Sequence, residues 1–166
     1  MGIDFYSSSI YDCAETIGAV LLARGWTLAT AESCTGGGLG HALTAVPGSS
    51  SWYLGGLISY SNAFKQQFLQ VSETLLSDYG AVSAEVAAAM AEGIAGRGEV
   101  ALAITGIAGP DGGTAAKPVG LVWLACLDPV RGTRTKRLDL RGSRDQIRQA
   151  AILGALEFFL QGLQIN

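Results

Sequence analysis

Blocks of hydrophobic and polar residues alternate along the chain in a pattern that predicts helices separated by strands. Residues 10–24 carry apolar side chains at helical spacing, and Gly25 ends that helix. Residues 27–31 are a short apolar segment, typical of a strand. Glycines 36–38 open a second helix, which runs to about Val46 before a Pro-Gly pair. The first part of the chain is therefore predicted to be helix, strand, helix.

The middle of the chain continues this alternation. Residues 54–60 predict a strand, after which Asn62 is expected to cap a helix. Ser72 and Ser83 are expected to cap two more helices, the second of which is rich in alanine. Residues 100–105 are continuously apolar, which is typical of a strand buried in the centre of a sheet.

The last part of the chain predicts two adjacent strands and a long helix. A loop at 106–118, rich in glycine and proline, leads to strands at 119–127 and 133–140, which a tight turn would pair. Ser143 and Gln146 form a capping box for the final helix. Beyond that box the helix is apolar on almost every face, so it must be buried in the domain or against a second subunit.

This order of elements predicts a single α/β domain. Strands interleaved with helices, followed by a pair of adjacent strands, favour a three-layer α/β/α sandwich with a mixed sheet. We expect one domain over 1–166 with its core at about 10–162, because no repeat or linker is evident. Apolar residues make up 49% of the chain and charged residues only 15%. Together with the apolar last helix, this composition leads us to expect a homodimer.

Charge and cysteine usage narrow the class of function. A net charge of −3 argues against nucleic-acid binding, although seven of the eleven basic residues lie between Arg131 and Arg148, where one edge can hold a small anion. The three cysteines have no paired spacing, which indicates a reducing compartment. No leader or membrane-spanning segment is evident. We therefore expect a cytoplasmic protein, with no membrane partner.

A small hydroxyl side chain occupies the position in this chain where a nucleophile is expected. Ser33 follows the strand at 27–31 and precedes a glycine-rich helix start, at the edge where open α/β sheets bind ligands. Backbone N–H groups from Cys34 to Gly37 can stabilise an oxyanion formed when the serine attacks a carbonyl. The alternative is that Ser33 or Thr35 simply caps the helix.

Lys65 makes the catalytic interpretation stronger. A lysine can act as a base if burial lowers its pKa, and the stretch 69–71 behind it (Leu-Gln-Val), with Phe64 and Phe68 beside it, is expected to supply apolar walls. A solvated surface lysine is the alternative. Tyr60, at the end of a strand and five residues before Lys65, can face the same cleft and relay a proton or orient the substrate.

The remaining candidates are weaker. His41 lies in mid-helix and is expected to be structural, and Cys34 is an alternative nucleophile without a basic partner nearby in sequence. Glycines in the loop after residue 105 let the backbone approach a ligand, and Thr105 can donate a hydrogen bond to a phosphate. Arg144 can bind an anion at a helix N-terminus. No His, Cys or carboxylate pattern has metal-ligand spacing, so no metal is expected.

Five short motifs follow one another along the chain: Ala-Glu-Ser33-Cys-Thr-Gly-Gly, Tyr60-Ser-Asn62 with Lys65, Gly-Ala-Val-Ser at 80–83, Thr105-Gly-Ile-Ala-Gly-Pro-Asp-Gly-Gly, and Lys117-Pro-Val-Gly. In this order they resemble the C-terminal domain of the competence/damage-inducible CinA proteins. The resemblance covers about residues 10–162, and in that family the domain also occurs alone as a nicotinamide mononucleotide (NMN) deamidase. Larger family members add an N-terminal domain like those of molybdenum-cofactor enzymes, which we do not expect here.

The resemblance implies an amidohydrolase that converts NMN to nicotinate mononucleotide and ammonia without a metal or organic cofactor. Ser33 would be the nucleophile, Lys65 its base, and Tyr60 would assist proton transfer. The matching positions for substrate binding are Cys34, Thr35, Gly36, Asn62, Thr105, Gly106 and Arg144, with Ser49 or Ser50. The alternatives are a non-catalytic nucleotide- or partner-binding module linked to competence or DNA damage, and an amidase or esterase of other specificity.

Overall fold

Helices and strands alternate along the chain and build three layers. The computed structural model describes residues 8–96 and 98–164. The helices are α1 (Ser8–Arg24), α2 (Gly38–Thr44), the short 3-10 helix η1 (Ser49–Ser51), α3 (Asn62–Leu69), α4 (Glu73–Tyr79), α5 (Ala84–Ala95) and α6 (Arg144–Gln164). The strands are β1 (Leu28–Glu32), β2 (Tyr53–Ile58), β3 (Val100–Gly106), β4 (Leu121–Asp128) and β5 (Gly132–Asp139).

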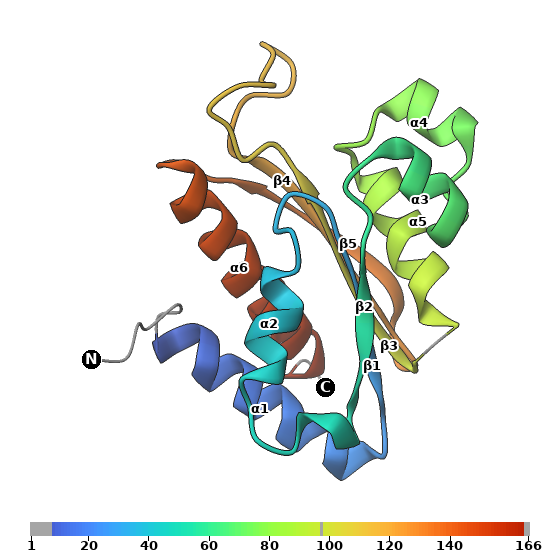
Figure 1. Ribbon diagram of the computed structural model, residues 1–166. Coiled ribbons are helices and arrows are strands. Elements are labelled where there is room, and N and C mark those ends of the chain that lie inside the picture. The colour runs from blue at the N-terminus through green and yellow to red at the C-terminus, as the bar shows by residue number, and fades with distance from the viewer. Residues whose placement is uncertain (1–7, 97, 165–166) are drawn as a thin grey trace.

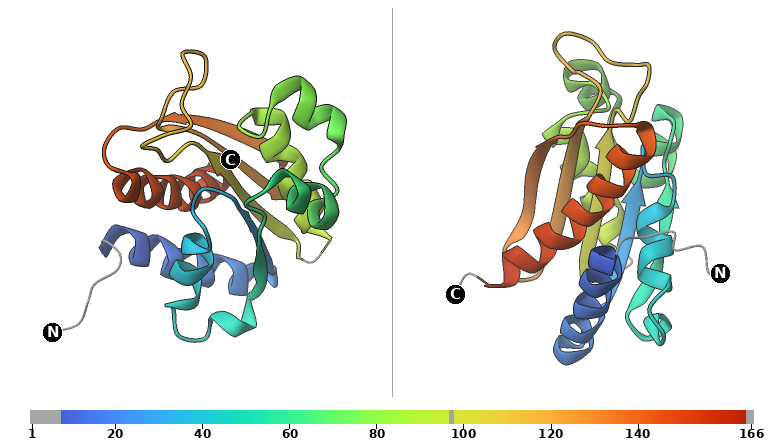
Figure 2. Two further views of the ribbon diagram at one scale, coloured as in Figure 1. Left: turned by 45° about the horizontal axis from the view of Figure 1, so that its top comes forward. Right: turned by 90° about the vertical axis from the view of Figure 1, so that its left-hand side faces the viewer.

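The five strands form one mixed sheet in the order β2-β1-β3-β4-β5. β1 pairs in parallel with both β2 and β3, whereas β4 is antiparallel to β3 and to β5. Helices α1, α2 and α6 cover one face of the sheet, and α3, α4 and α5 lie on the other (Figures 1 and 2). The predicted three-layer α/β/α fold with a mixed sheet is confirmed.

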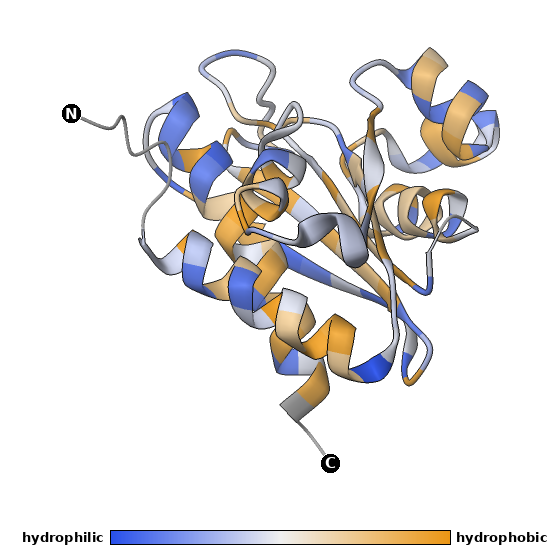
Figure 3. Ribbon diagram, turned by 60° about the horizontal axis from the view of Figure 1, so that its bottom comes forward, coloured by the Kyte–Doolittle hydropathy of each residue, from blue (hydrophilic) through white to orange (hydrophobic). Residues whose placement is uncertain are grey.

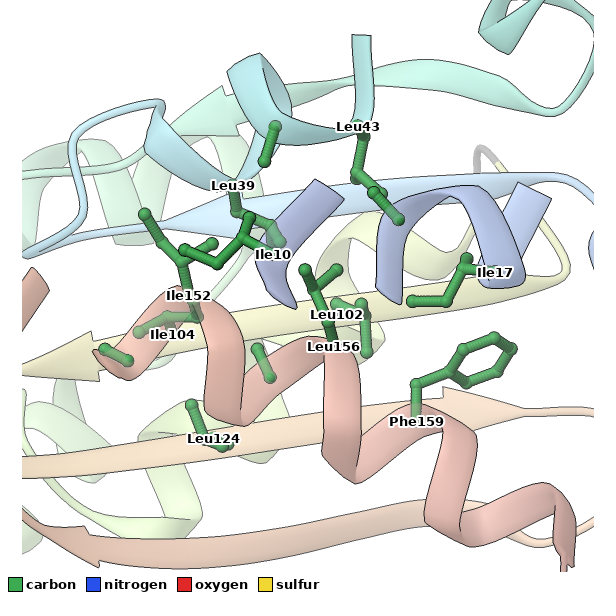
Figure 4. Packing of buried hydrophobic residues seen from close by; sticks show 14 of the residues in the cluster. Ile10, Ile17, Leu39, Leu43, Leu102, Ile104, Leu124, Ile152, Leu156 and Phe159 are labelled. Carbon is green, nitrogen blue, oxygen red and sulfur yellow. The ribbon is translucent and has the colours of Figure 1, made fainter. Parts of the chain in front are cut away.

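The core on the α1 side of the sheet absorbs most of the apolar last helix. Most helices are striped with hydrophobic and hydrophilic residues, as expected for elements that cover a sheet (Figure 3). Leu156 and Phe159 of α6 are fully buried and meet Ile10 and Ile17 of α1 and Leu102 of β3 (Figure 4). The apolar faces of α6 are thus packed largely within the subunit, so this helix no longer supports the expectation of a dimer.

Three of the four predicted helix caps are confirmed, and one is displaced by a residue. Ser61, and not Asn62, caps α3, because its hydroxyl accepts a hydrogen bond from Phe64 N at 3.2 Å. The capping box of α6 is confirmed, since Ser143 N donates to the Gln146 side chain at 2.8 Å and Gln146 N donates back to the serine hydroxyl at 3.3 Å. The predicted caps Ser72 and Ser83 are also confirmed.

One edge of the sheet gathers the segments to which the sequence assigns chemistry. β1, β2 and β3 all end at this edge, and because β4 is antiparallel to β3, it begins there. The loop between β3 and β4 projects from the same edge (Figure 1), and α6 starts beside it. This is where ligands bind in open α/β sheets.

Two expectations fall partly outside this description. The absence of a leader segment and the outer limits of the 1–166 domain concern residues 1–7 and 165–166, which lie outside the described residues. Over the ranges that are described, no helix combines the length and the apolarity that a membrane crossing requires.

Candidate active site

Ser33 lies directly after β1, at the edge of the sheet where the strands end. Its backbone N–H donates to Ile104 O on β3 at 2.9 Å, which extends the ladder between β1 and β3 by one residue. The chain then turns through 34–37, where Gly36 and Gly37 have φ values of 60° and 94° that favour glycine. The serine is 8% exposed, so its hydroxyl is sheltered but reachable.

Lys65 is buried beside Ser33, although it belongs to a different element. The amine is on α3, and its Nζ lies 3.1 Å from Ser33 Oγ. Nζ also donates to Ser59 O at 2.7 Å and contacts Tyr60 O at 3.4 Å. Only 1% of the Lys65 surface is exposed, so the alternative of a solvated lysine is wrong.

Burial changes the protonation of this lysine. Removal of the amine from water lowers the pKa of Lys65 from 10.5 to about 8, because the charged form loses its hydration. A neutral amine has two N–H groups, which the carbonyls of Ser59 and Tyr60 can accept, and one lone pair. That lone pair is then available to the Ser33 hydroxyl, so the pair has the geometry of a nucleophile and its base.

The apolar surroundings of Lys65 are only partly those that the sequence suggested, since Leu69 and Val71 are buried as expected. Phe64 and Phe68 contact each other in a tilted arrangement with ring centroids 4.8 Å apart, but they are 49% and 39% exposed. They lie on the outer side of α3, whereas Lys65 and Leu69 share the buried side. The expectation that the two phenylalanines wall the amine is therefore wrong.

Cys34 is less suited than Ser33 to act as the nucleophile. Its thiol is 6% exposed, and burial raises its pKa to about 11. Since the thiolate is the reactive form, this thiol is almost wholly protonated at neutral pH.

A pocket of about 260 Å³ opens at the Ser33–Lys65 pair. Its lining includes seven of the candidate residues that the sequence singled out: Ser33, Cys34, Tyr60, Lys65, Thr105, Gly106 and Arg144. Its other walls come from the connection between α4 and α5 and from the β3–β4 loop: Ala81, Val82, Ile107, Ala108, Gly109, Asp111 and Gly112. The pocket therefore has a hydroxyl and an amine at one place and a guanidinium group at another.

Arg144 and Tyr60 meet at the pocket wall. Arg144 Nη2 donates to Tyr60 Oη at 3.3 Å, and Nη1 donates to Gly109 O at 2.6 Å. Within the described residues the Tyr60 hydroxyl has no hydrogen bond to Ser33 or Lys65, and the ring is 62% exposed. This geometry favours an orienting role for Tyr60 over a proton relay.

Thr105 and Thr35 use their hydroxyl protons inside the protein. Thr105 Oγ1 donates to Ala81 O at 2.7 Å, which joins the end of β3 to the α4–α5 connection, so it does not aim a donor at a phosphate. Thr35 Oγ1 donates to Glu32 at 2.7 Å, and the side chain is fully buried outside the pocket lining.

The turn after Ser33 offers fewer free N–H groups than the sequence suggested. Gly36 N donates to Ser33 O at 3.1 Å, and Gly37 N donates to the Glu32 carboxylate at 3.1 Å. Among the described residues, the N–H groups of Cys34 and Thr35 have no such acceptor. Only these two groups of the predicted four therefore remain available to an oxyanion.

Four further candidates lie away from the pocket lining. Gly36 and Asn62 are exposed and are not part of the lining. Ser49 and Ser50 belong to η1, which precedes β2 and so lies at the opposite end of that strand from Ser59. His41 is exposed on α2, also outside the lining.

Glu32 is the residue of this site that the sequence interpretation missed. Its buried carboxylate accepts the N–H groups at the start of α2, so the alternative that Ser33 or Thr35 caps this helix is wrong. An acidic residue at a strand end, just before a glycine-rich helix start, was the available signal. The role of Lys117, which belongs to one of the five motifs, was also missed. Its amine holds the β3–β4 loop by donating to Tyr79 O and, at 2.8 Å, to Val82 O.

The fold and the site define a class of protein: an α/β protein with a buried serine–lysine pair in a pocket at the carboxyl edge of its sheet. In the described part of the chain, no group of three or more His, Cys, Asp or Glu side chains is placed to hold a metal ion.

The comparisons identify the family. The model of the CinA C-terminal domain matches residues 10–163, so the chain belongs to the CinA family. It is 42% identical to the nicotinamide-nucleotide amidohydrolase PncC of Enterobacter agglomerans, over 92% of this chain and 94% of that protein. It is 45% identical to a CinA-like protein of Desulfotalea psychrophila, over 95% of this chain but only 38% of that protein. The chain thus spans about two fifths of the CinA-like relatives that it matches.

Solved structures agree with this assignment. The crystal structure of the competence/damage inducible protein CihA from Agrobacterium tumefaciens has a TM-score of 0.93 and 37% identity, and the match covers 99% of this chain and 100% of that one. A competence-damaged protein (CinA) superfamily structure from Escherichia coli has a TM-score of 0.88 and 34% identity over 97% of this chain and 98% of that one.

Proposed function

We propose that this protein is an amidohydrolase that converts NMN to nicotinate mononucleotide and ammonia. The observation that supports it most is the 3.1 Å separation of Ser33 Oγ and Lys65 Nζ, with the amine 1% exposed and a pocket opening at the pair. The similarity to a protein named as a nicotinamide-nucleotide amidohydrolase, which extends over almost all of both chains, supports the substrate.

The first half of the proposed reaction forms an acyl-enzyme. Ser33 Oγ attacks the carboxamide carbon while neutral Lys65 accepts the hydroxyl proton, which leaves a tetrahedral oxyanion. The free N–H groups of Cys34 and Thr35 are the candidates to stabilise it. The C–N bond then breaks, the Lys65 ammonium returns its proton to the leaving nitrogen, and ammonia departs.

The second half of the reaction regenerates the serine. Water attacks the ester carbon, neutral Lys65 takes a proton from that water, and the second tetrahedral intermediate collapses. The bond to Ser33 Oγ breaks, and Lys65 returns its proton to that oxygen. The carboxylic acid so formed loses its own proton to solvent and leaves as nicotinate mononucleotide. Each half of the cycle needs the amine neutral at the start, so a pKa of about 8 keeps a useful fraction of Lys65 neutral near neutral pH.

The phosphate end of the substrate is assigned to Arg144. This guanidinium lines the pocket, and its hydrogen bonds to Gly109 O and Tyr60 Oη hold the side chain in place. Gly106 also lines the pocket, but its lack of a side chain is explained by the neighbouring strand, because a Cβ there would come within 2.7 Å of Val122. Arg144→Met is expected to raise KM for NMN.

We place this activity in pyridine-nucleotide salvage in the cytoplasm. Free Cys13, Cys34 and Cys126 fit a reducing compartment. Binding of NMN without turnover would support a nucleotide-binding module instead.

We also propose a homodimer, on different grounds from those that the last helix offered. β2 is an edge strand of the sheet, and Leu54 and Ile58 on it are 55% and 51% exposed. The sequence has no Asp, Glu, Lys or Arg between Glu32 and Lys65, so this edge lacks the charges that discourage strand pairing. A second copy presents the same uncharged strand and meets no like-charge repulsion.

Ammonia release from NMN tests the activity. Wild-type protein is expected to release ammonia, whereas Ser33→Ala and Lys65→Met lose several orders of magnitude in kcat and still bind NMN. Ser72→Ala, which removes a helix cap outside the pocket lining, is the matched control and is expected to keep wild-type kcat. Wild-type turnover by Ser33→Ala would refute the serine mechanism.

A further inference from the structure

The residue before the proposed nucleophile has an unusual environment. Glu32 is the last residue of β1 and is 2% exposed. One carboxylate oxygen accepts hydrogen bonds from Thr35 Oγ1 at 2.7 Å, Leu39 N at 3.0 Å and Gly37 N at 3.1 Å. The other oxygen accepts one from Gly40 N at 2.8 Å.

These four donors account for a carboxylate that would otherwise be costly to bury. No Lys or Arg within the described residues forms an ion pair with Glu32, so hydrogen bonds alone compensate its loss of hydration. The donors belong to the turn at 35–37 and to the first turn of α2. The side chain therefore ties the whole turn that follows Ser33 back to the strand that precedes it.

The backbone of the same residue reaches toward Lys65. Glu32 O accepts Ser59 N at 2.8 Å and contacts the Ser59 hydroxyl at 3.4 Å. Ser59 O in turn accepts Lys65 Nζ at 2.7 Å. Glu32 is thus bonded on one side to the turn of the nucleophile and on the other to the residue that anchors the base.

We infer that Glu32 is a positioning residue, whose carboxylate holds the Ser33 turn so that the hydroxyl meets the Lys65 amine before substrate binds. Glu32 is not part of the pocket lining, and within the described residues its carboxylate has no hydrogen bond to Ser33 Oγ or Lys65 Nζ, so it acts through the backbone that carries Ser33. This inference rests on the proposed function for its catalytic meaning. Small displacements of a reacting group cost large factors in rate, so a loosened turn lowers kcat.

Glu32→Gln is the main test because it keeps the shape and removes one acceptor. With its amide oxygen toward Thr35, Gly37 and Leu39, the new NH2 group faces Gly40 N, donor against donor. We expect kcat for NMN to fall by about 10- to 100-fold, as misplacement of a reacting group predicts, with KM changed far less. Ser72→Ala loses a helix cap without touching this turn, so a general loss of stability would lower both variants alike.

Thr35 supplies a milder variant if Glu32→Gln does not fold. Thr35→Val removes one of the four donors with little change of volume, while Thr35→Ser keeps the hydroxyl. Thr35→Ser is expected to retain more kcat than Thr35→Val. Thr35→Val and Glu32→Gln remove different hydrogen bonds of one network around this side chain, so their effects are expected to be non-additive.

Reaction of Ser33 with a fluorophosphonate probe separates this inference from the choice of substrate. The wild type is expected to label at Ser33, and Glu32→Gln to label more slowly, whether or not NMN is turned over. A wild type that labels but releases no ammonia from NMN would overturn the proposed substrate and leave the positioning role standing. Wild-type kcat and wild-type labelling in a folded Glu32→Gln would overturn the positioning role.

Discussion

At the scale of single residues, the site depends on one buried amine. Lys65 is almost completely buried, and its amine has three hydrogen-bond partners: the carbonyls of Ser59 and Tyr60 and the Ser33 hydroxyl. Such a group is unfavourable for folding in its charged form and useful for proton transfer in its neutral form. The pKa of Lys65, lowered to about 8, reflects both the unfavourable burial of the charged form and the availability of the neutral form.

The cost of this amine should be visible as a dependence of stability on pH. Since the pKa of Lys65 is about 8 in the folded state and 10.5 when unperturbed, the unfolded chain binds more protons between these values. The free energy of unfolding of the wild type is therefore expected to rise with pH across this window, relative to Lys65→Met. The full difference corresponds to about 3 kcal/mol.

Urea unfolding of wild type and Lys65→Met at pH 7 and pH 10.5 measures this change. Groups such as Cys34 titrate in both proteins and largely cancel in the comparison. A gap between the two proteins that stays constant with pH would show that the Lys65 pKa is not lowered.

At the scale of elements, α3 determines where the amine lies. The helix starts at a Ser61 cap, and its register then turns Lys65 and Leu69 inward and Phe64 and Phe68 outward. A helix of eight residues is marginal by itself, so its cap and its packing decide whether it forms.

The Ser61 cap gives a direct prediction with a neighbouring control. Ser61→Ala removes the acceptor of Phe64 N and is expected to destabilise the protein by about 1 kcal/mol. Asn62→Ala is expected to have little effect, since no hydrogen bond of the Asn62 side chain caps the helix. Thermal or urea unfolding distinguishes them, and equal losses in both variants would contradict this assignment of the cap.

At the scale of the whole molecule, the edges of the sheet differ in charge. β5 carries Arg134, Lys136 and Arg137, whereas β2 carries no charge and exposes Leu54 and Ile58. Charges on an edge strand are a common means of preventing pairing with another chain. The proposed dimer therefore uses β2 and leaves β5 free.

Sedimentation with one charged substitution on each surface tests this assembly. Leu54→Lys is expected to convert the dimer to a 17.1 kDa monomer. Val130→Lys replaces an apolar residue that is somewhat more exposed, at 65%, in the β4–β5 turn, and is expected to remain dimeric. A wild type that sediments only as the monomer would refute the proposal.

Periodicity and capping residues were sufficient to predict the layers of this fold. The continuously apolar 100–105 segment is indeed the central β3, and the capping box at Ser143 begins α6. These features are local, so they can be read without knowing the tertiary structure. Two boundaries were predicted one or two residues away from their places: α3 is capped by Ser61 and not Asn62, and β4 starts at Leu121 and not at 119, because Gly120 has a φ of 92°.

From the sequence, residues could be assigned to the site only where they belong to a recognisable motif at the end of a strand. Ser33 and Lys65 were identified from the resemblance and from their strand-end positions, and the structure brings them together. The role of Glu32 and the hydrogen bond of Thr105 to Ala81 depend on segments far apart in the chain, which no local pattern specifies. The sequence also did not reveal which side chains of α3 face the core, as the exposed Phe64 shows.

The pH dependence of kcat/KM for NMN tests the serine–lysine mechanism most directly, because it reports the base in the free enzyme. The measurement belongs above pH ~6.5, where the phosphate of the substrate, with a second pKa of about 6, is already mostly in its doubly charged form. We expect kcat/KM to rise about tenfold per pH unit and to level off near the Lys65 pKa of about 8. A flat profile between pH 6.5 and 9 would contradict the role of Lys65 as the base.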